Sequence, residues 1–190
     1  MIQQGEPQRL FVAIRPPQSA IDHLTDYLRD LHVATPWGRC LRYDLWHVTV
    51  TYLGDIAVDR FEQVGAAIRR AADRTSPLRL ALAGGGRWGR GRYNIVYTGL
   101  DGEVDRLVGL ATRTRAALDE AELPYDRRQY RPHLTVAPAS AKLGNTESAE
   151  DLVELRRYRG PEWKVASVGL YRSIPQPEPR YELIDSVVLA

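Results

Sequence analysis

Apolar and polar residues follow two spacings along this chain, one typical of strands and one typical of helices. Runs of alternating or β-branched apolar residues predict strands, and apolar residues three or four positions apart predict helices. The predicted strands cover residues 9–14, 45–53, 78–82, 93–100, 133–137, 164–171 and 181–188. The predicted helices begin at Ser19, Asp59, Glu103 and Ser148, and the last is stopped by Gly160 and Pro161.

Polar residues at the starts of two helices fit the capping pattern, in which a first polar side chain is followed three positions later by an acidic one. Ser19 with Asp22 and Asp59 with Glu62 have this spacing. We therefore expect each pair to cap the first turn of its helix.

The connections between several predicted strands read as turns rather than helices. A stretch rich in glycine and arginine, residues 84–92, separates strands 78–82 and 93–100 and predicts the tip of a hairpin. A doubly wound parallel sheet needs a helical crossover between successive strands. The pattern therefore favours the α+β class with antiparallel sheets.

The two halves of the chain repeat one order of elements: a helix, a strand that contains His-x-Thr, and a further helix. The repeat includes His47 and His133, which are 86 residues apart, close to half of the chain length. We expect a single domain over residues 1–190, built from two similar lobes that bring the repeated strands together at a shared cleft.

Two tetrapeptides carry the candidate chemistry, HVTV at residues 47–50 and HLTV at residues 133–136. On a strand, residues two apart share a face, with Cα atoms roughly 6.5–7 Å apart, so each histidine points the same way as its threonine. An imidazole can take or give a proton near neutral pH, and a threonine hydroxyl can bind a phosphate oxygen. One such motif alone is more often structural, but two matching motifs favour an acid and a base acting on one substrate.

Other candidates for chemistry are weaker. His23 and His32 lie outside the apolar face of the first helix, and we expect them to be solvated. Cys40 has no obvious base beside it that would make it a nucleophile. Neither His47 nor His133 has a second histidine, cysteine or carboxylate at ligand spacing, so the sequence predicts no metal site.

Composition narrows the class of protein further. The 190 residues include 26 basic and 24 acidic side chains, a net charge of +2, whereas non-specific duplex binders need a strong basic excess. Cys40 is the single cysteine, which excludes a disulfide within the chain and indicates a reducing compartment. No apolar run approaches the roughly 18 residues of a membrane span. We therefore expect a cytoplasmic protein without a membrane partner.

Four segments resemble the two-histidine (2H) phosphoesterase superfamily, and in particular the bacterial RNA 2′,3′-cyclic phosphodiesterases, the 2′-5′ RNA ligase-like family. They are RLFVAIRPP (residues 9–17), WHVTVTYLGD (46–55), YRPHLTVAP (130–138) and YELIDSVVL (181–189). The resemblance implies a bilobal α+β fold of two pseudo-symmetric lobes. Each lobe would have an antiparallel sheet and flanking helices, with the active-site cleft between them.

The same resemblance implies an activity. It is the metal-independent hydrolysis of 2′,3′-cyclic phosphates at RNA 3′ ends or on nucleotides, leaving a 2′-phosphate. His47, Thr49, His133 and Thr135 would be the catalytic residues. By analogy, His133 activates the water and His47 protonates the leaving 3′ oxygen. No cofactor is implied, and we expect a monomer.

Residues near the motifs are candidates for substrate binding: Arg131, Tyr130, Arg42 and Arg87. Arg131 lies two residues before His133 and would share its face on a continuing strand. Pro138 stands where many relatives carry an arginine, so that contact would have to come from Arg131 or from the arginines of residues 84–92. The arginines and Trp88 of that stretch could stack a base and hold a phosphate, or could simply form a solvated hairpin tip.

Two other functions fit the same residues. One is 2′-5′ RNA ligation or its reverse at the same site. The other is a non-catalytic module that binds RNA or nucleotides and keeps the cleft, although the intact histidine and threonine of both motifs argue against it. A ligation assay with defined RNA halves tests the first, and binding of nucleoside 2′-phosphates without hydrolysis would favour the second.

Overall fold

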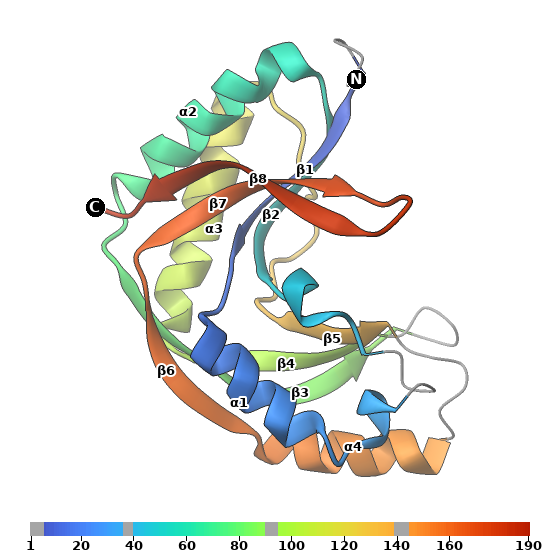
Figure 1. Ribbon diagram of the computed structural model, residues 1–190. Helices are drawn as coiled ribbons and strands as arrows, with labels where there is room; N and C mark the ends of the chain where they lie inside the picture. The colour runs from blue at the N-terminus through green and yellow to red at the C-terminus, as the bar shows by residue number, and fades with distance from the viewer. Residues whose placement is uncertain (1–5, 36–39, 90–94, 139–144) are drawn as a thin grey trace.

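The computed structural model describes residues 6–35, 40–89, 95–138 and 145–190. Within these ranges the chain forms four α-helices and one curled antiparallel sheet of eight strands (Figure 1). The strands are β1 (Gln8–Ile14), β2 (Val48–Ile56), β3 (Leu78–Trp88), β4 (Ile95–Gly102), β5 (Leu134–Pro138), β6 (Arg159–Val165), β7 (Ser167–Ile174) and β8 (Arg180–Val188). The helices are α1 (Gln18–Leu28), α2 (Phe61–Ala72), α3 (Val104–Glu120) and α4 (Asn145–Arg157). In the described part of the chain, no helix is long and apolar enough to cross a membrane.

The sheet consists of two halves that meet at a narrow seam. The strand order is β6-β3-β4-β5-β2-β1-β7-β8, and the seam between β5 and β2 is a single pairing of Val48 with Leu134. We call β2, β1, β7 and β8 the first lobe, and β6, β3, β4 and β5 the second lobe. The predicted bilobal α+β class is confirmed, and the sheets of the two lobes join edge to edge.

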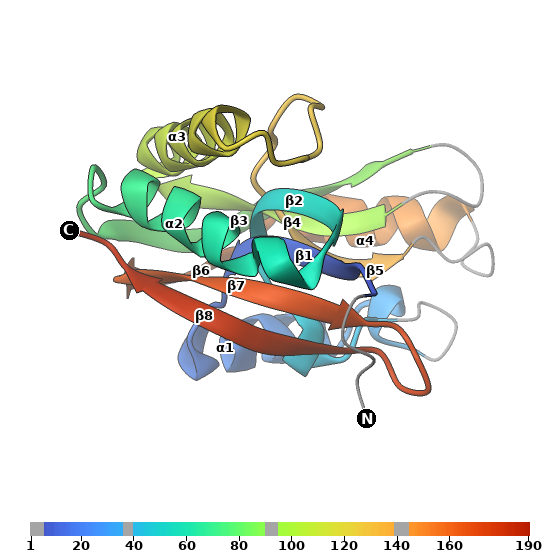
Figure 2. The ribbon, with the colours of Figure 1, turned by 90° about the horizontal axis from the view of Figure 1, so that it is seen from above.

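The helices cross between the lobes. α1 follows β1 of the first lobe but packs against β6 and β3 of the second, where α4 also packs on β3. α3 follows β4 of the second lobe but packs against α2 and β2. Figure 2 shows α2 and α3 side by side, and Figure 1 shows α1 near α4. This exchange ties together two half-sheets that share only one strand pairing.

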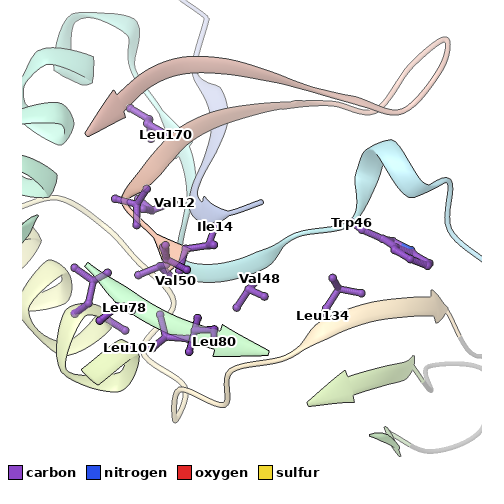
Figure 3. Close-up of a cluster of buried hydrophobic side chains, with 14 of the residues drawn as sticks. Val12, Ile14, Trp46, Val48, Val50, Leu78, Leu80, Leu107, Leu134 and Leu170 are labelled. Carbon is purple, nitrogen blue, oxygen red and sulfur yellow. The ribbon is translucent and has the colours of Figure 1, made fainter. Parts of the chain in front are cut away.

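The central strands have one face in the core and one face outside it. Val48, Val50, Leu134 and Val136 are fully buried, and Figure 3 shows the first three in a cluster that also includes Trp46. Complete burial of such a side chain contributes roughly 1.5–3 kcal/mol of transfer free energy. A slip of one residue would exchange the two faces of a strand, so this burial fixes the register at the seam.

The strand predicted over residues 164–171 is wrong, because the chain forms two strands, β6 and β7, in this region. Gly160 and Pro161 lie inside β6 and do not stop a helix. A Cβ at Gly160 would lie 2.7 Å from the Tyr158 hydroxyl and 3.0 Å from the carbonyl oxygen of Leu82, so a larger residue there would force its neighbours to shift. Proline is tolerated at residue 161 because β6 is an edge strand.

Neither predicted capping pair caps its helix. α1 begins at Gln18, directly after Pro17, and no side chain caps its first turn. α2 begins at Phe61 after a 3-10 turn over Val58–Arg60, again without a side-chain cap. In both places the preceding backbone, a proline or a tight turn, leads into the helix instead.

Candidate active site

The seam brings the two motifs side by side. His47 lies immediately before β2, and His133 lies immediately before β5. Because the seam pairing is antiparallel, the next positions along it place Thr49 beside His133 and Thr135 beside His47. The four side chains are half-buried and alternate with fully buried valine and leucine residues, so they share the face of the sheet that lies outside the core.

The same hydrogen bond orients both imidazoles. His47 Nδ1 lies 2.8 Å from the carbonyl oxygen of Leu45, and His133 Nδ1 lies 2.7 Å from that of Arg131. A carbonyl oxygen only accepts, so Nδ1 carries the proton in both rings. The Nε2 atoms are left to exchange protons with a substrate.

Burial lowers the pKa of both imidazoles. The positive charges of Arg15 and His133 lower the pKa of His47 further, while the hydrogen bonds to the carbonyls of Leu45 and Arg131 act in the opposite direction. Both rings are therefore neutral bases at pH 7 in the unliganded protein. A bound anion would raise both pKa values, so an imidazole becomes an acid when a phosphate is present.

Aromatic rings hold the imidazoles on both sides of the seam. The ring of His47 lies 4.9 Å from that of Phe11 and 5.1 Å, edge-on, from that of Tyr181, measured between centroids. The ring of His133 lies 4.4 Å, edge-on, from that of Trp88. Phe11 and Tyr181 lie on predicted strands, whereas Trp88 was expected in a hairpin tip and lies at the end of β3. Only the strand pairing shows that these rings reach the histidines.

The surroundings of the two histidines differ. A cleft of about 560 Å³ opens beside His133 and Thr49, with walls from Trp88 and from the segment of residues 126–131. The side of His47 is closed by Phe11, Arg15, Tyr171 and Tyr181, which leave only a narrow crevice. The site is thus roomy at one histidine and tight at the other.

Two of the four predicted substrate-binding residues, Tyr130 and Arg131, line this cleft. The hydroxyl of Tyr130 donates a hydrogen bond to the carbonyl of Thr49 at 3.0 Å, and burial raises the pKa of this tyrosine. Tyr130 therefore braces β2. Arg131 has an exposed side chain at the cleft, and its carbonyl positions His133.

The structure does not bring Arg42 and Arg87 into the cleft. The guanidinium of Arg42 bonds to Asp44 at 2.7 and 3.0 Å and lies 3.5 Å from Glu178. Arg87 pairs across the sheet with buried Val96, so it points to the face opposite Trp88. Of the arginine-rich stretch, residues 90–92 lie outside the described residues.

Two arginines at the site were not predicted. Arg15, just after β1, lies at the crevice with His47. Arg115 of α3 lines the cleft, with its guanidinium carbon 5.6 Å from the centroid of Tyr130 and a hydrogen bond to the carbonyl of Arg128. The resemblance segment RLFVAIRPP contains Arg15, but no pattern in the sequence indicates that Arg15 lies beside His47. Arg115 looks like any surface residue of a helix.

The remaining polar candidates lie elsewhere. In the described ranges, no three His, Cys, Asp or Glu side chains are close enough together to hold a metal ion. Burial raises the pKa of the Cys40 thiol to about 11, so it is a poor nucleophile. His23 is exposed on α1, as expected, whereas His32 lies in a 3-10 turn and bonds through Nδ1 to buried Asp151 at 3.0 Å.

Comparison with known sequences gives a consistent result. A family model described as the 2′-5′ RNA ligase superfamily matches residues 16–175. The RNA 2′,3′-cyclic phosphodiesterase of Geobacillus stearothermophilus is 25% identical over 175 residues, which cover 92% of this chain and 55% of that protein. The protein of the same name from Escherichia coli (strain K12) is 28% identical over 132 residues, covering 70% of this chain and 72% of that protein. The chain thus spans about half the length of the first relative.

Solved structures show the same fold. E. coli LigT in apo form has a TM-score of 0.78 at 23% identity, and LigT complexed with 3′-AMP has a TM-score of 0.77 at 23% identity. Both comparisons cover 97% of this chain and 99% of LigT. The family model spans both histidine motifs and most of the chain. The chain therefore belongs to the 2′-5′ RNA ligase superfamily, the two-histidine phosphoesterases.

Proposed function

We propose that this protein hydrolyses 2′,3′-cyclic phosphates at RNA ends or on nucleotides and leaves a 2′-phosphate. The observation that carries the proposal is the seam, where His47 and His133 share one face and each donates Nδ1–H to a carbonyl. A cyclic phosphodiester needs a base on one side of phosphorus and an acid on the other, with no redox chemistry. The two relatives named RNA 2′,3′-cyclic phosphodiesterase support this reaction.

In the proposed mechanism each histidine has one role. The Nε2 atom of His133 takes a proton from water as the water oxygen attacks phosphorus. The bond between phosphorus and the 3′ oxygen breaks, and His47, protonated at Nε2, gives its proton to that oxygen. The products are a free 3′-hydroxyl and a 2′-phosphate. The roomier side at His133 can admit water, which favours this assignment over the reverse.

The threonines supply charge stabilisation. Thr49 lies beside His133 and Thr135 beside His47, so each hydroxyl can donate to a non-bridging phosphoryl oxygen next to a proton-transfer group. Donors fixed on strands need little reorganisation as charge develops in the transition state.

Substitution of each histidine tests the proposal. With an oligonucleotide that ends in a 2′,3′-cyclic phosphate, we expect His47→Ala and His133→Ala each to lower kcat by roughly 100-fold or more, because each loses one proton transfer. His23→Ala is the matched control, since His23 lies on α1 outside the site; its Nδ1 is 3.2 Å from the hydroxyl of Tyr158, so the folded stability of this variant is measured alongside its activity. Phosphorus NMR follows the substrate and identifies the isomer formed. Full activity in either single variant would contradict the mechanism.

Ligation is the second candidate, because the matching family model is described by that reaction. An RNA half with a 2′,3′-cyclic phosphate and a second half with a 5′-hydroxyl would then give a joined 2′-5′ product. We expect hydrolysis to dominate in dilute solution, where water far exceeds the second RNA end. Joined RNA as the main product would reverse this order.

A further inference from the structure

Arg15 lies next to His47 in the sheet. Ile14, the last residue of β1, pairs with Val48 in an antiparallel register, so the next position of the chain lies beside the residue before Val48. That residue is His47. The crevice at the closed end of the site is lined by both side chains together with two tyrosines, which agrees with the register.

The guanidinium of Arg15 is free to bind an anion. Its side chain is exposed, and no carboxylate in the described part of the chain lies within ion-pair distance of it. Asp44 is close enough for Arg15 to lower its pKa slightly, but Arg42 already holds that carboxylate through two hydrogen bonds. A cation without a partner beside a proton-transfer group is poorly explained by stability alone.

The positive charge of Arg15 affects the pKa values of the ionisable side chains that line the crevice with it. It acts to lower the pKa of His47, and it also acts on the hydroxyls of Tyr171 and Tyr181, where burial prevails and raises the pKa. His133 is the other ionisable group whose charge reaches His47. An anionic oxygen that lies over the seam beside His47 would therefore meet one permanent cation, Arg15.

We propose that Arg15 binds a non-bridging phosphoryl oxygen of the substrate beside His47, with the phosphate over the seam between the two histidines. The proposal rests on the proposed function. A guanidinium offers paired N–H donors that match two oxygens of one phosphate. Arg15 exchanges no proton, but it balances charge on the phosphoryl oxygens while the bond to the 3′ oxygen breaks.

Phosphate binding also changes His47. In the unliganded protein, burial and the positive charge of Arg15 disfavour the imidazolium form of His47. A bound phosphate neutralises Arg15 and adds negative charge, so His47 takes up a proton when substrate arrives. The general acid is then charged in the complex in which it is needed.

Binding experiments with Arg15→Gln and Arg15→Lys test the proposal. The control is Arg9→Gln, at the other end of β1, where Arg9 lies 3.5 Å from Asp55 and away from the site. NMR titration of the His47 ring with inorganic phosphate and with a nucleoside 2′-phosphate reports binding without turnover. We expect Arg15→Gln to weaken both roughly 10- to 100-fold, Arg15→Lys to weaken them less, and Arg9→Gln to bind as the native protein does.

The titration of His47 gives a second measurement. Without phosphate, we expect the pKa of His47 to be higher in Arg15→Gln than in the native protein, because one repulsive charge is gone. Unchanged phosphate affinity in Arg15→Gln, or no phosphate binding by the native protein, would overturn the proposal. If the native protein binds phosphate through Arg15 but does not hydrolyse cyclic phosphates, the proposed function fails and the anion site stands.

Discussion

His47 and His133 have the same hydrogen bond in different surroundings. The backbone carbonyls fix the tautomer of each ring, while the closed crevice and the open cleft set how each exchanges protons. Both folded-state pKa values lie below the usual value of about 6.5, chiefly because of burial. The unfolded chain therefore binds protons at these residues more readily than the folded protein does.

This difference predicts how stability depends on pH. The contribution of the two histidines is complete above the unfolded pKa of about 6.5 and is lost as the pH falls toward their lower folded values. We therefore expect the variant with both His47→Asn and His133→Asn to lose less free energy of unfolding between pH 7.5 and 5.5 than the native protein loses. Urea denaturation at the two pH values measures this loss.

His32 supplies a control of opposite sign. Its hydrogen bond to Asp151 raises its pKa, so its contribution is present at low pH and is lost as the pH rises through the folded value. His32→Asn should therefore lose more stability on acidification than the native protein. A shift in the same direction for both variants would refute this account of the histidines.

At the level of single residues, the two-residue period of a strand was enough to predict that each histidine shares a face with its threonine. It was not enough to place Arg15 beside His47, because that contact depends on the register between β1 and β2. Arg42 and Arg87 were chosen for closeness in sequence and for charge. Asp44 binds the guanidinium of Arg42, and the alternation of side chains along β3 turns Arg87 to the face opposite Trp88.

At the level of elements, β3 packs very closely against β4 and α4 in the second lobe. At Gly85, a Cβ would lie 2.7 Å from the carbonyl oxygen of Tyr97 on β4 and 2.8 Å from the Cβ of Leu155 on α4. Neither of these atoms belongs to the flexible end of a side chain. Gly85 therefore allows β3 to pack closely against β4 and α4.

Gly85→Ala should consequently destabilise the fold by about 1–3 kcal/mol through overpacking. Gly109→Ala is the matched control, because a Cβ there meets only the guanidinium of Arg113, 3.2 Å away, and alanine favours the helix. Denaturation midpoints of the two variants give the comparison. Equal stability of both variants would show that β3 can move away from α4 at little cost.

Sequence patterns predicted most elements but not their exact limits. Long periodic segments such as α3 were found because several turns repeat one apolar face. The boundary between β6 and β7 was missed because Gly160 and Pro161 usually end an element, whereas an edge strand tolerates both. The predicted caps failed because Pro17 leads into α1 and a 3-10 turn leads into α2.

At the level of the whole molecule, the two lobes contribute equal shares of one site. Each supplies a histidine, a threonine and aromatic neighbours, and an arginine stands at the closed end. The repeat of His-x-Thr predicted this arrangement in outline. The exchange of α1 and α3 between lobes left no trace in the sequence pattern, because an apolar helix face does not say which sheet it covers.

Because the proposed base, acid and charge-stabilising groups are all side chains, we expect hydrolysis to persist after chelation. The initial rate with a cyclic-phosphate oligonucleotide should change less than about twofold after dialysis against EDTA, because no metal takes part in the proposed mechanism. Rates measured before chelation, after chelation, and after addition of Mg²⁺ or Zn²⁺ provide the comparison. A rate lost with EDTA and restored by one metal would require a different mechanism.

The order of the strands along the chain has a consequence for the order of events during synthesis. The first lobe is discontinuous along the chain: β1 and β2 are made first, while β7 and β8, which cover the edge of β1, are made last. Contacts this distant in sequence form slowly and late. His47 leaves the ribosome long before Tyr181, whose ring closes its crevice. A nascent chain therefore carries both histidines well before the site is complete, and we expect the proposed activity to appear only after β8 is in place.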